Sequence, residues 1–103
     1  AYTASKSAII GFSKSIAAFY AKNNIRINVI APALVETPMS QRAANDEAIL
    51  SFIKTKQPLD GGRIGYPEDL DGLAIYFMSD QSKFTTGQIV AVDGGWSISE
   101  GQY

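Results

Sequence analysis

Two short runs rich in β-branched residues, 25–31 and 88–92, constrain the fold of this chain more than any other feature. Before each run, apolar residues recur at three- and four-residue steps, which is the pattern of an amphipathic helix. The expected order is therefore helix, strand, helical insert, helix, strand. Parallel strands joined by helices are normally covered on both faces by other elements. The sequence predicts an α/β fold with a parallel sheet.

Two longer helices are expected, one from residue 2 to about residue 23 and one beginning at Pro67. The apolar stripe of the first consists of Ile9, Phe12, Ile16, Phe19 and Tyr20. The second begins with a proline followed by two acidic residues, which favour a helix N-terminus. Its apolar face is expected to consist of Leu70, Leu73, Ala74, Phe77 and Met78.

Two strands are too few for a stable open sheet. The apolar sides of the first helix and of both strands have no obvious partners in this sequence. No Ser, Thr, Asp or Asn caps the first helix at its start. We therefore expect residues 1–103 to be the C-terminal half of one larger domain whose N-terminal half is absent.

Composition excludes several classes of protein. The 103 residues carry a formal net charge of -1 and contain no histidine or cysteine. This charge gives no general attraction for nucleic acid or for an anionic membrane. Imidazole and thiolate metal sites, Ser-His and Cys-His nucleophile pairs and disulfides are all excluded. No apolar run approaches the length of a membrane span, and we expect a cytoplasmic protein with no metal site.

Tyr2 and Lys6 are the strongest candidates for chemistry. Residues four apart on a helix share one face, so the phenol and the ammonium can point into the same pocket. A nearby positive charge favours the phenolate and lowers the pKa of a tyrosine. Such a tyrosine can act as a general acid or base. The alternative is that Lys6 extends from the edge of the apolar stripe and Tyr2 is an ordinary half-buried aromatic.

Residues 33–38 follow the first strand, which we expect to be buried and to end at Pro32. Open α/β sheets place their ligands at this end of a strand. Residues 39–56 are expected to form one or two short helices, with Ile49, Leu50, Phe52 and Ile53 as their apolar residues. Their position suits a substrate lid, and a plain surface helix is the alternative. Residues 57–62 are expected to form a loop, and Asp93-Gly94-Gly95 a tight turn.

Several motifs occur in a fixed order along the chain: Tyr2 to Lys6 with Ala4-Ser5 between them, Arg26-Ile-Asn-Val-Ile-Ala-Pro32, Val35-Glu-Thr-Pro38, Gly65-Tyr-Pro-Glu-Asp69, Thr86-Gly87 and Val92-Asp-Gly-Gly95. As a set they closely resemble the C-terminal half of the classical short-chain dehydrogenase/reductase family, up to about residue 98. The resemblance implies a Rossmann-type, doubly wound parallel sheet of which two strands are present. It also implies NAD or NADP as cofactor, an alcohol or carbonyl substrate, and a homo-oligomer, dimer or tetramer.

The resemblance assigns roles to individual residues. Tyr2 is implied to be the acid/base that exchanges a proton with the substrate oxygen. Lys6 is implied to lower the pKa of that tyrosine and to hold the nicotinamide ribose. Backbone groups of Val35 are implied to bind the nicotinamide carboxamide, and the Thr37 hydroxyl to lie near the carboxamide or pyrophosphate. The implied cofactor-binding set is Tyr2, Lys6, Pro32, Ala33, Val35 and Thr37.

Departures from the family pattern limit this assignment. Ala33 stands where the family usually has glycine, so its methyl group could crowd the nicotinamide or forbid a backbone angle that glycine allows. Gly61-Gly62 adds one residue to what we expect to be a surface turn. The glycine-rich turn, the residue that selects NAD or NADP and the catalytic serine would belong to the absent half, so the fragment alone is expected to be inactive.

Other functions stay open at this point. One is a non-catalytic packing or oligomerisation fragment, and another is an epimerase or dehydratase on the same fold. Pro32 and Pro38 could simply shape their loop. Trp96 and the tail after it could pack at a subunit boundary.

Overall fold

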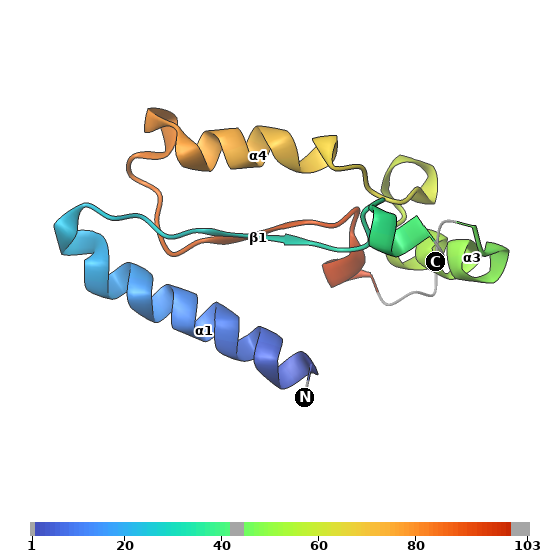
Figure 1. The fold of residues 1–103 in the computed structure, drawn as a ribbon, viewed down its shortest axis with the longest axis horizontal. Coiled ribbons are helices and arrows are strands. Elements are labelled where there is room, and N and C mark those ends of the chain that lie inside the picture. The colour runs from blue at the N-terminus through green and yellow to red at the C-terminus, as the bar shows by residue number, and fades with distance from the viewer. Residues whose placement is uncertain (1, 42–44, 100–103) are drawn as a thin grey trace. The chain divides into compact units, whose positions relative to one another are not determined.

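The computed structural model describes residues 2–41 and 45–99, apart from the side chains of Tyr2, Thr3, Lys6 and Met39. The elements, shown in chain order in Figure 1, are α1 (Tyr2–Tyr20), a 3₁₀ turn (Ala21–Asn23), β1 (Val29–Pro32), a 3₁₀ turn (Pro38–Ser40), α3 (Glu47–Lys56), a 3₁₀ turn (Leu59–Gly62), α4 (Glu68–Met78), a 3₁₀ turn (Asp80–Ser82), β2 (Ile89–Val92) and a 3₁₀ turn (Trp96–Ile98). The chain forms two compact units, Ala1–Ile30 with Leu73–Val90 and Ala31–Gly72 with Ala91–Tyr103. Each unit is described by itself below.

In the first unit, α1 confirms the predicted N-terminal helix. The helix continues into a 3₁₀ turn and ends at Asn24, whose left-handed backbone (φ 62°) allows the chain to reverse. Ala17 is buried at 1% exposure. An ideal Cβ built on Gly87 would lie 3.7 Å from the Ala17 Cβ, so α1 packs closely against the residues that lead into β2.

Four of the five residues in the predicted stripe of α1 are exposed, and Ile16 is half-buried. Ile9, Phe12 and Phe19 are 62%, 67% and 62% exposed. This confirms the expectation that the stripe has no partner within the described chain. On α4 the predicted apolar face is half-buried except for Met78, which is 79% exposed.

Strands β1 and β2 run side by side as a two-stranded parallel sheet (Figure 1). The prediction of strand structure from residue 25 was wrong at its start, because β1 begins only at Val29. Before Val29 the two segments are joined by one backbone bond, from the Gly87 N–H to the Ile27 carbonyl (2.8 Å), and by side chains: Thr86 Oγ1 accepts from the Ile27 N–H (3.1 Å), and Asn28 Nδ2 donates to the Thr85 carbonyl (3.0 Å). Residues 29–31 are half-buried and 32 is exposed, in line with the expectation that both strands lack partners in this sequence. Full burial of the strand in the whole protein stays a prediction.

A buried hydroxyl anchors the segment between α4 and β2 in the same unit. Ser82 is 0% exposed, and its Oγ accepts from Arg26 Nη1 at 2.7 Å. The same hydroxyl lies 3.0 Å from the carbonyl oxygens of Phe77 and Ser79, to which it can donate. A buried polar group with these partners is satisfied, so Ser82 stabilises the first unit without contributing apolar area.

The second unit has a small core built on α3. The 3₁₀ turn at residues 38–40 and α3 confirm the prediction of one or two short helices between residues 39 and 56, with residues 42–44 outside the described chain. Asp46 caps α3, because its Oδ1 accepts from the N–H groups of Ala48 and Ile49. Ile53 (4% exposed) and Gln57 (2% exposed) are its buried residues.

The turn Leu59–Gly62 is more than a surface insertion. Asp60, Gly61 and Gly62 all have positive φ angles, of 54°, 78° and 79°. An ideal Cβ on Gly62 would overlap Lys54 Cγ and lie 3.0 Å from Lys54 Cα. The glycine pair therefore lets the turn approach the backbone of α3 closely.

None of the described helices is long and apolar enough to cross a membrane.

Candidate functional site

The loop that follows β1, residues 33–37, is held on one side by Gly65. Val35 and Gly65 form an isolated parallel bridge. Gly65 donates its N–H to the Leu34 carbonyl (3.0 Å), and its own carbonyl accepts from the Glu36 N–H (2.7 Å). An ideal Cβ on Gly65 would lie 3.3 Å from the Leu34 oxygen, which is tighter than ordinary contact. The bridge points the N–H and C=O groups of Val35 away from Gly65.

Ser40 holds the loop at its other end. Its Oγ accepts from the Thr37 N–H at 2.7 Å and donates to the Val35 carbonyl at 2.7 Å. The Thr37 hydroxyl donates to Ser40 Oγ over a longer distance, 3.3 Å. In the described part of the chain the Val35 N–H has no hydrogen-bond partner. Among the described residues, Val35 thus presents a free backbone donor beside a carbonyl whose partner is Ser40.

Ala33 fits its position without backbone strain. The described non-glycine residues with positive φ are Asn24 and Asp60, so Ala33 adopts an angle that any L-residue accepts. That the methyl group excludes a backbone angle that glycine would allow here stays a prediction. Crowding of the nicotinamide by that methyl group stays a prediction.

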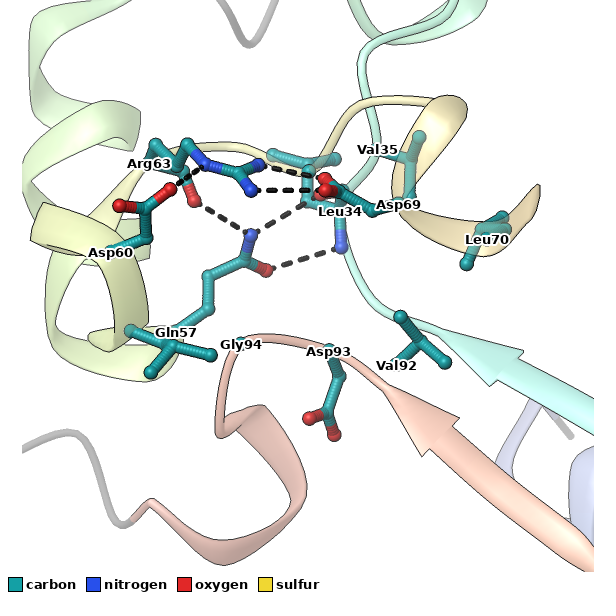
Figure 2. Close-up of a pocket in the computed structure, with 12 residues that line it drawn as sticks. Leu34, Val35, Gln57, Asp60, Arg63, Asp69, Leu70, Val92, Asp93 and Gly94 are labelled. Atoms are coloured by element: carbon teal, nitrogen blue, oxygen red, sulfur yellow. Dashed lines mark hydrogen bonds and ion pairs between the residues drawn. The ribbon is translucent and has the colours of Figure 1, made fainter. Parts of the chain in front are cut away.

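Gln57 joins the loop to the end of α3. Its side-chain amide accepts from the Leu34 N–H (3.2 Å) and donates to the carbonyls of Leu34 (3.2 Å) and Arg63 (3.1 Å), as Figure 2 shows. A pocket of about 170 Å³ adjoins these groups. It is too small for a dinucleotide, so we interpret it as a gap in the interior behind the loop.

Arg63 and Asp69 form the charged part of this site (Figure 2). Arg63 Nη1 lies 2.7 Å from Asp69 Oδ2 and Nη2 lies 3.0 Å from Oδ1, while Nε contacts Asp60 at 2.6 Å. Asp69 Oδ2 also accepts from the Tyr66 N–H at 2.7 Å. Hydrogen bonds from Arg63 and then from the Tyr66 backbone lower the pKa of Asp69 to about 2. Hydrogen bonds to Asp69 and Asp60 raise the pKa of Arg63.

The lowered pKa of Asp69 predicts that this residue makes the folded chain less stable in acid than near neutral pH. The pKa of Asp69 is lower in the folded chain (about 2) than the roughly 3.9 of an unfolded aspartate. Its contribution to stability is therefore fully present above pH ~4 and is lost as pH falls toward 2. We expect Asp69→Asn to lower the melting temperature at pH 6 and to reduce the further fall between pH 4 and pH 2.5, measured by circular dichroism.

The matched control for this prediction is Asp71→Asn. Asp71 lies on the same helix, and in the described residues it forms no ion pair. We expect this variant to keep the acid dependence of the wild type. An unchanged dependence in Asp69→Asn as well would show that the Arg63 pair does not contribute to it.

The turn after β2 confirms the predicted tight turn. Asp93 Oδ1 accepts from the Gly95 N–H at 3.0 Å, and Oδ2 accepts from the Ser97 N–H at 2.9 Å. Burial opposes ionisation of Asp93, but the hydrogen bonds from Ser97 and Gly95 outweigh it and lower its pKa. Trp96 then contacts Phe52 edge-to-face, and Lys56 Nζ lies 5.6 Å from its ring centroid. Trp96 is thus used within the second unit.

The sequence-predicted site residues fall in two places. Pro32, Ala33, Val35 and Thr37 are consecutive or nearly so at the end of β1 and in its loop, within the second unit. The backbones of Tyr2 and Lys6 lie on α1, one turn apart, in the first unit. The side chains of these two residues lie outside the described part of the chain. Their roles stay predictions.

Three residues that shape the loop were missed from the sequence. Gln57 follows Ile53 by four positions, and this spacing on the buried face of α3 is the signal that could have revealed it. Asp69 follows Tyr66 by three, the spacing of a side chain that binds a helix-start N–H. Ser40 likewise follows Thr37 by three. None of these spacings indicates the contacts to Leu34 or Val35.

Comparison with known proteins identifies the family. A family model described as enoyl-(acyl carrier protein) reductase matches residues 1–97. The chain belongs to the short-chain dehydrogenase/reductase family. Relatives include 3-oxoacyl-[acyl-carrier-protein] reductase FabG of Thermotoga maritima, 41% identical over 99 residues (94% of this chain, 38% of the relative). Another is 2-keto-3-deoxy-L-fuconate dehydrogenase of Xanthomonas campestris pv. campestris, 41% identical over 101 residues (93% of this chain, 33% of the relative).

Solved structures of short-chain dehydrogenases/reductases have the same fold. 4-Hydroxyisoleucine dehydrogenase complexed with NADH superposes with a TM-score of 0.89 at 37% identity, over 96% of this chain and 40% of that chain. A short-chain dehydrogenase/reductase from Mycobacterium ulcerans superposes with a TM-score of 0.88 at 30% identity, over 95% of this chain and 35% of that chain. The prediction of a Rossmann-type α/β fold is confirmed. The chain spans only about 33% to 40% of the length of these relatives and structures.

Proposed function

We propose that the protein carrying this chain is a NAD(P)-dependent oxidoreductase that interconverts an alcohol and a ketone or aldehyde. The observation that carries this proposal is the family match over residues 1–97, which includes Tyr2 and Lys6 at helical spacing. In support, relatives are named as dehydrogenases and reductases, and one structural neighbour is complexed with NADH.

The loop after β1 fits a nicotinamide carboxamide. A carboxamide offers one acceptor oxygen and an N–H₂ donor. Among the described residues, Val35 has the complementary pair, a backbone N–H without a partner and a carbonyl that accepts from Ser40 alone. Thr37 adds a hydroxyl, which lies 3.3 Å from Ser40 Oγ in the capping box at the start of the 3₁₀ turn. On this proposal Pro32 and Ala33 form the start of the same loop.

The chemistry is divided between the cofactor and the chain. The nicotinamide supplies or accepts the hydride when bound. Tyr2 gives a proton to the carbonyl oxygen of the substrate in reduction and takes one from the hydroxyl in oxidation. Lys6 holds the ribose hydroxyls and favours the ionised phenol by its charge. Val35 and Thr37 orient the nicotinamide.

The rest of the proposal concerns the whole protein. Residues 1–103 form the C-terminal half of one NAD(P)-binding domain in a cytoplasmic homo-oligomer, and the other half supplies the glycine-rich turn and the catalytic serine. Residues 39–56 form the substrate lid. The exposure of Phe52 (55%) and Ile49 (37%) on α3 supports the lid, because these apolar side chains are available to a substrate.

Lys6→Met tests the binding part of this proposal in the full-length protein. We expect nicotinamide fluorescence titrations to give saturable binding of NADH or NADPH to the wild type and a roughly tenfold higher Kd for the variant, since a charged hydrogen bond is lost. The rise of alcohol oxidation with pH should also shift to higher pH, because the phenolate loses its neighbouring cation.

Lys14→Met is the control for this experiment. Lys14 is an exposed lysine on α1, and its replacement removes the same charge from the same helix. We expect it to leave the Kd and the pH profile unchanged. Absence of binding by the wild type to both cofactors would refute the proposed function itself.

A further inference from the structure

Gln57 is the most deeply buried residue with a polar side chain in the second unit. It caps α3, where its backbone N–H donates to the Ile53 carbonyl at 2.7 Å. Its side chain turns inward, so that the residue is only 2% exposed. Burying an amide costs free energy unless its polar atoms find partners. The partners of this side chain therefore indicate why a polar residue stands at this position.

Every amide hydrogen of Gln57 is used, and only one orientation of the amide fits. Oε1 accepts from the Leu34 N–H at 3.2 Å. The two hydrogens on Nε2 point to the carbonyls of Leu34 (3.2 Å) and Arg63 (3.1 Å), as in Figure 2. The two contacts to Leu34 pair the amide with that peptide much as a neighbouring strand would.

The stem of Gln57 is fixed by packing as well. An ideal Cβ on Gly94 would lie only 2.9 Å from the Gln57 Cβ. Gly94 itself has a positive φ of 61°. The turn after β2 thus approaches the stem so closely that Gly94 has no room for a side chain, and this packing restricts the rotamers open to Gln57. A rigid side chain is a suitable support for a binding loop.

Leu34 is the residue through which this support reaches the proposed nicotinamide contact. Gln57 binds its peptide groups on one side, and Gly65 donates to its carbonyl from the other at 3.0 Å. Val35 is next in the chain, and its N–H is the free donor of the loop among the described residues. The Leu34 carbonyl and the Val35 N–H belong to one planar peptide group. A rotation of that group would therefore turn the Val35 N–H.

We propose that Gln57 is a positioning residue that orients the Val35 N–H toward the nicotinamide carboxamide and ties the end of the lid segment to that loop. This inference rests on the proposed function, because it assigns Gln57 to the cofactor site. Gln57 does not touch the reacting atoms. Its effect passes through Leu34.

Gln57→Met in the full-length protein is the direct test. Methionine keeps the length and apolar stem of the side chain but removes all three hydrogen bonds. We expect the Kd for the preferred nicotinamide cofactor to rise about tenfold, which is the effect of one misplaced hydrogen bond. We also expect faster amide hydrogen exchange in the peptide that covers residues 33–37, measured without cofactor by mass spectrometry.

Ser82→Ala is the matched control. It removes a hydroxyl at 0% exposure that also contacts three polar partners, but in the first unit. We expect a comparable fall in melting temperature with no change in the Kd or in exchange at 33–37. If both variants change the Kd equally, Gln57 acts through general stability and the proposal is wrong.

A second variant covers the case in which Gln57→Met fails to fold. Gln57→Glu retains an acceptor for the Leu34 N–H but loses both donors, so we expect a higher Kd at pH 8. Burial at this position raises the pKa of the new carboxyl, so we expect partial recovery at pH 5, where the protonated acid can donate. Wild-type Kd and exchange in a folded Gln57 variant would overturn the positioning role alone. Failure of the wild type to bind NADH and NADPH would overturn the proposed function and this inference with it.

Discussion

Replacing Tyr2 with phenylalanine should lower turnover by the full-length protein by about 10²- to 10⁴-fold, the usual contribution of a positioned general acid or base. The substitution removes one hydroxyl and keeps the ring, so packing on α1 and the Kd for the cofactor should change little. Steady-state assays with the preferred cofactor measure turnover, and fluorescence titration measures binding. A fall in kcat with an unchanged Kd separates loss of chemistry from loss of binding.

Tyr20→Phe is the control for this prediction. Tyr20 is the last residue of α1, is 41% exposed, and its hydroxyl forms no hydrogen bond within the described residues. Removing that hydroxyl should leave kcat within about twofold of the wild type. If Tyr2→Phe kept most of the activity, Tyr2 would not be the acid/base, and another group would have to move the proton.

The sequence was sufficient for the features that arise from local signals. The helical periodicity of residues 2–20 depends on neighbours three and four positions away, so α1 could be predicted without knowing what covers it. The start of α4 at Glu68 follows from Pro67 and the acidic residues after it. The turn at residues 93–95 follows from an aspartate before two glycines that adopt positive φ.

Contacts between distant segments could not be predicted. Gln57 reads as a loop residue in the sequence, and its buried position appears only when Leu34, 23 residues earlier, is brought beside it. The late start of β1 has a similar cause, because Thr85 and Thr86 bind residues 27 and 28 across 57 to 59 positions. No local periodicity encodes such pairings, since they depend on the arrangement of the elements.

In the candidate site, too, the local positions of residues could be predicted from the sequence, whereas the contacts between distant segments could not. The motifs place Pro32, Ala33, Val35 and Thr37 in one loop, and the structure agrees on their local positions. What holds that loop came only from the structure: Ser40 at one end and Gln57 beneath Leu34. A family motif indicates residues that contact a ligand, whereas the residues that orient them can come from any element that packs nearby.

Gly62→Ala should destabilise the full-length protein by about 2 to 4 kcal/mol, from a left-handed backbone angle and a steric clash together. Gly62 has a φ of 79°, which costs an L-residue free energy. Its new Cβ would overlap Lys54 Cγ and lie 3.0 Å from Lys54 Cα, a backbone atom that cannot move unless α3 shifts. The free energy of unfolding from urea titration measures the effect.

Gly61→Ala separates the cost of the left-handed backbone angle from the cost of the steric clash. Gly61 has nearly the same angle, φ 78°, but an ideal Cβ there meets no heavy atom within 4 Å. This variant should therefore lose only about 1 kcal/mol, the cost of the left-handed angle. The difference between the two variants is the cost of pushing the turn away from Lys54. Equal losses would mean that the turn does not approach α3 in solution, and the extra glycine would then only lengthen a surface loop.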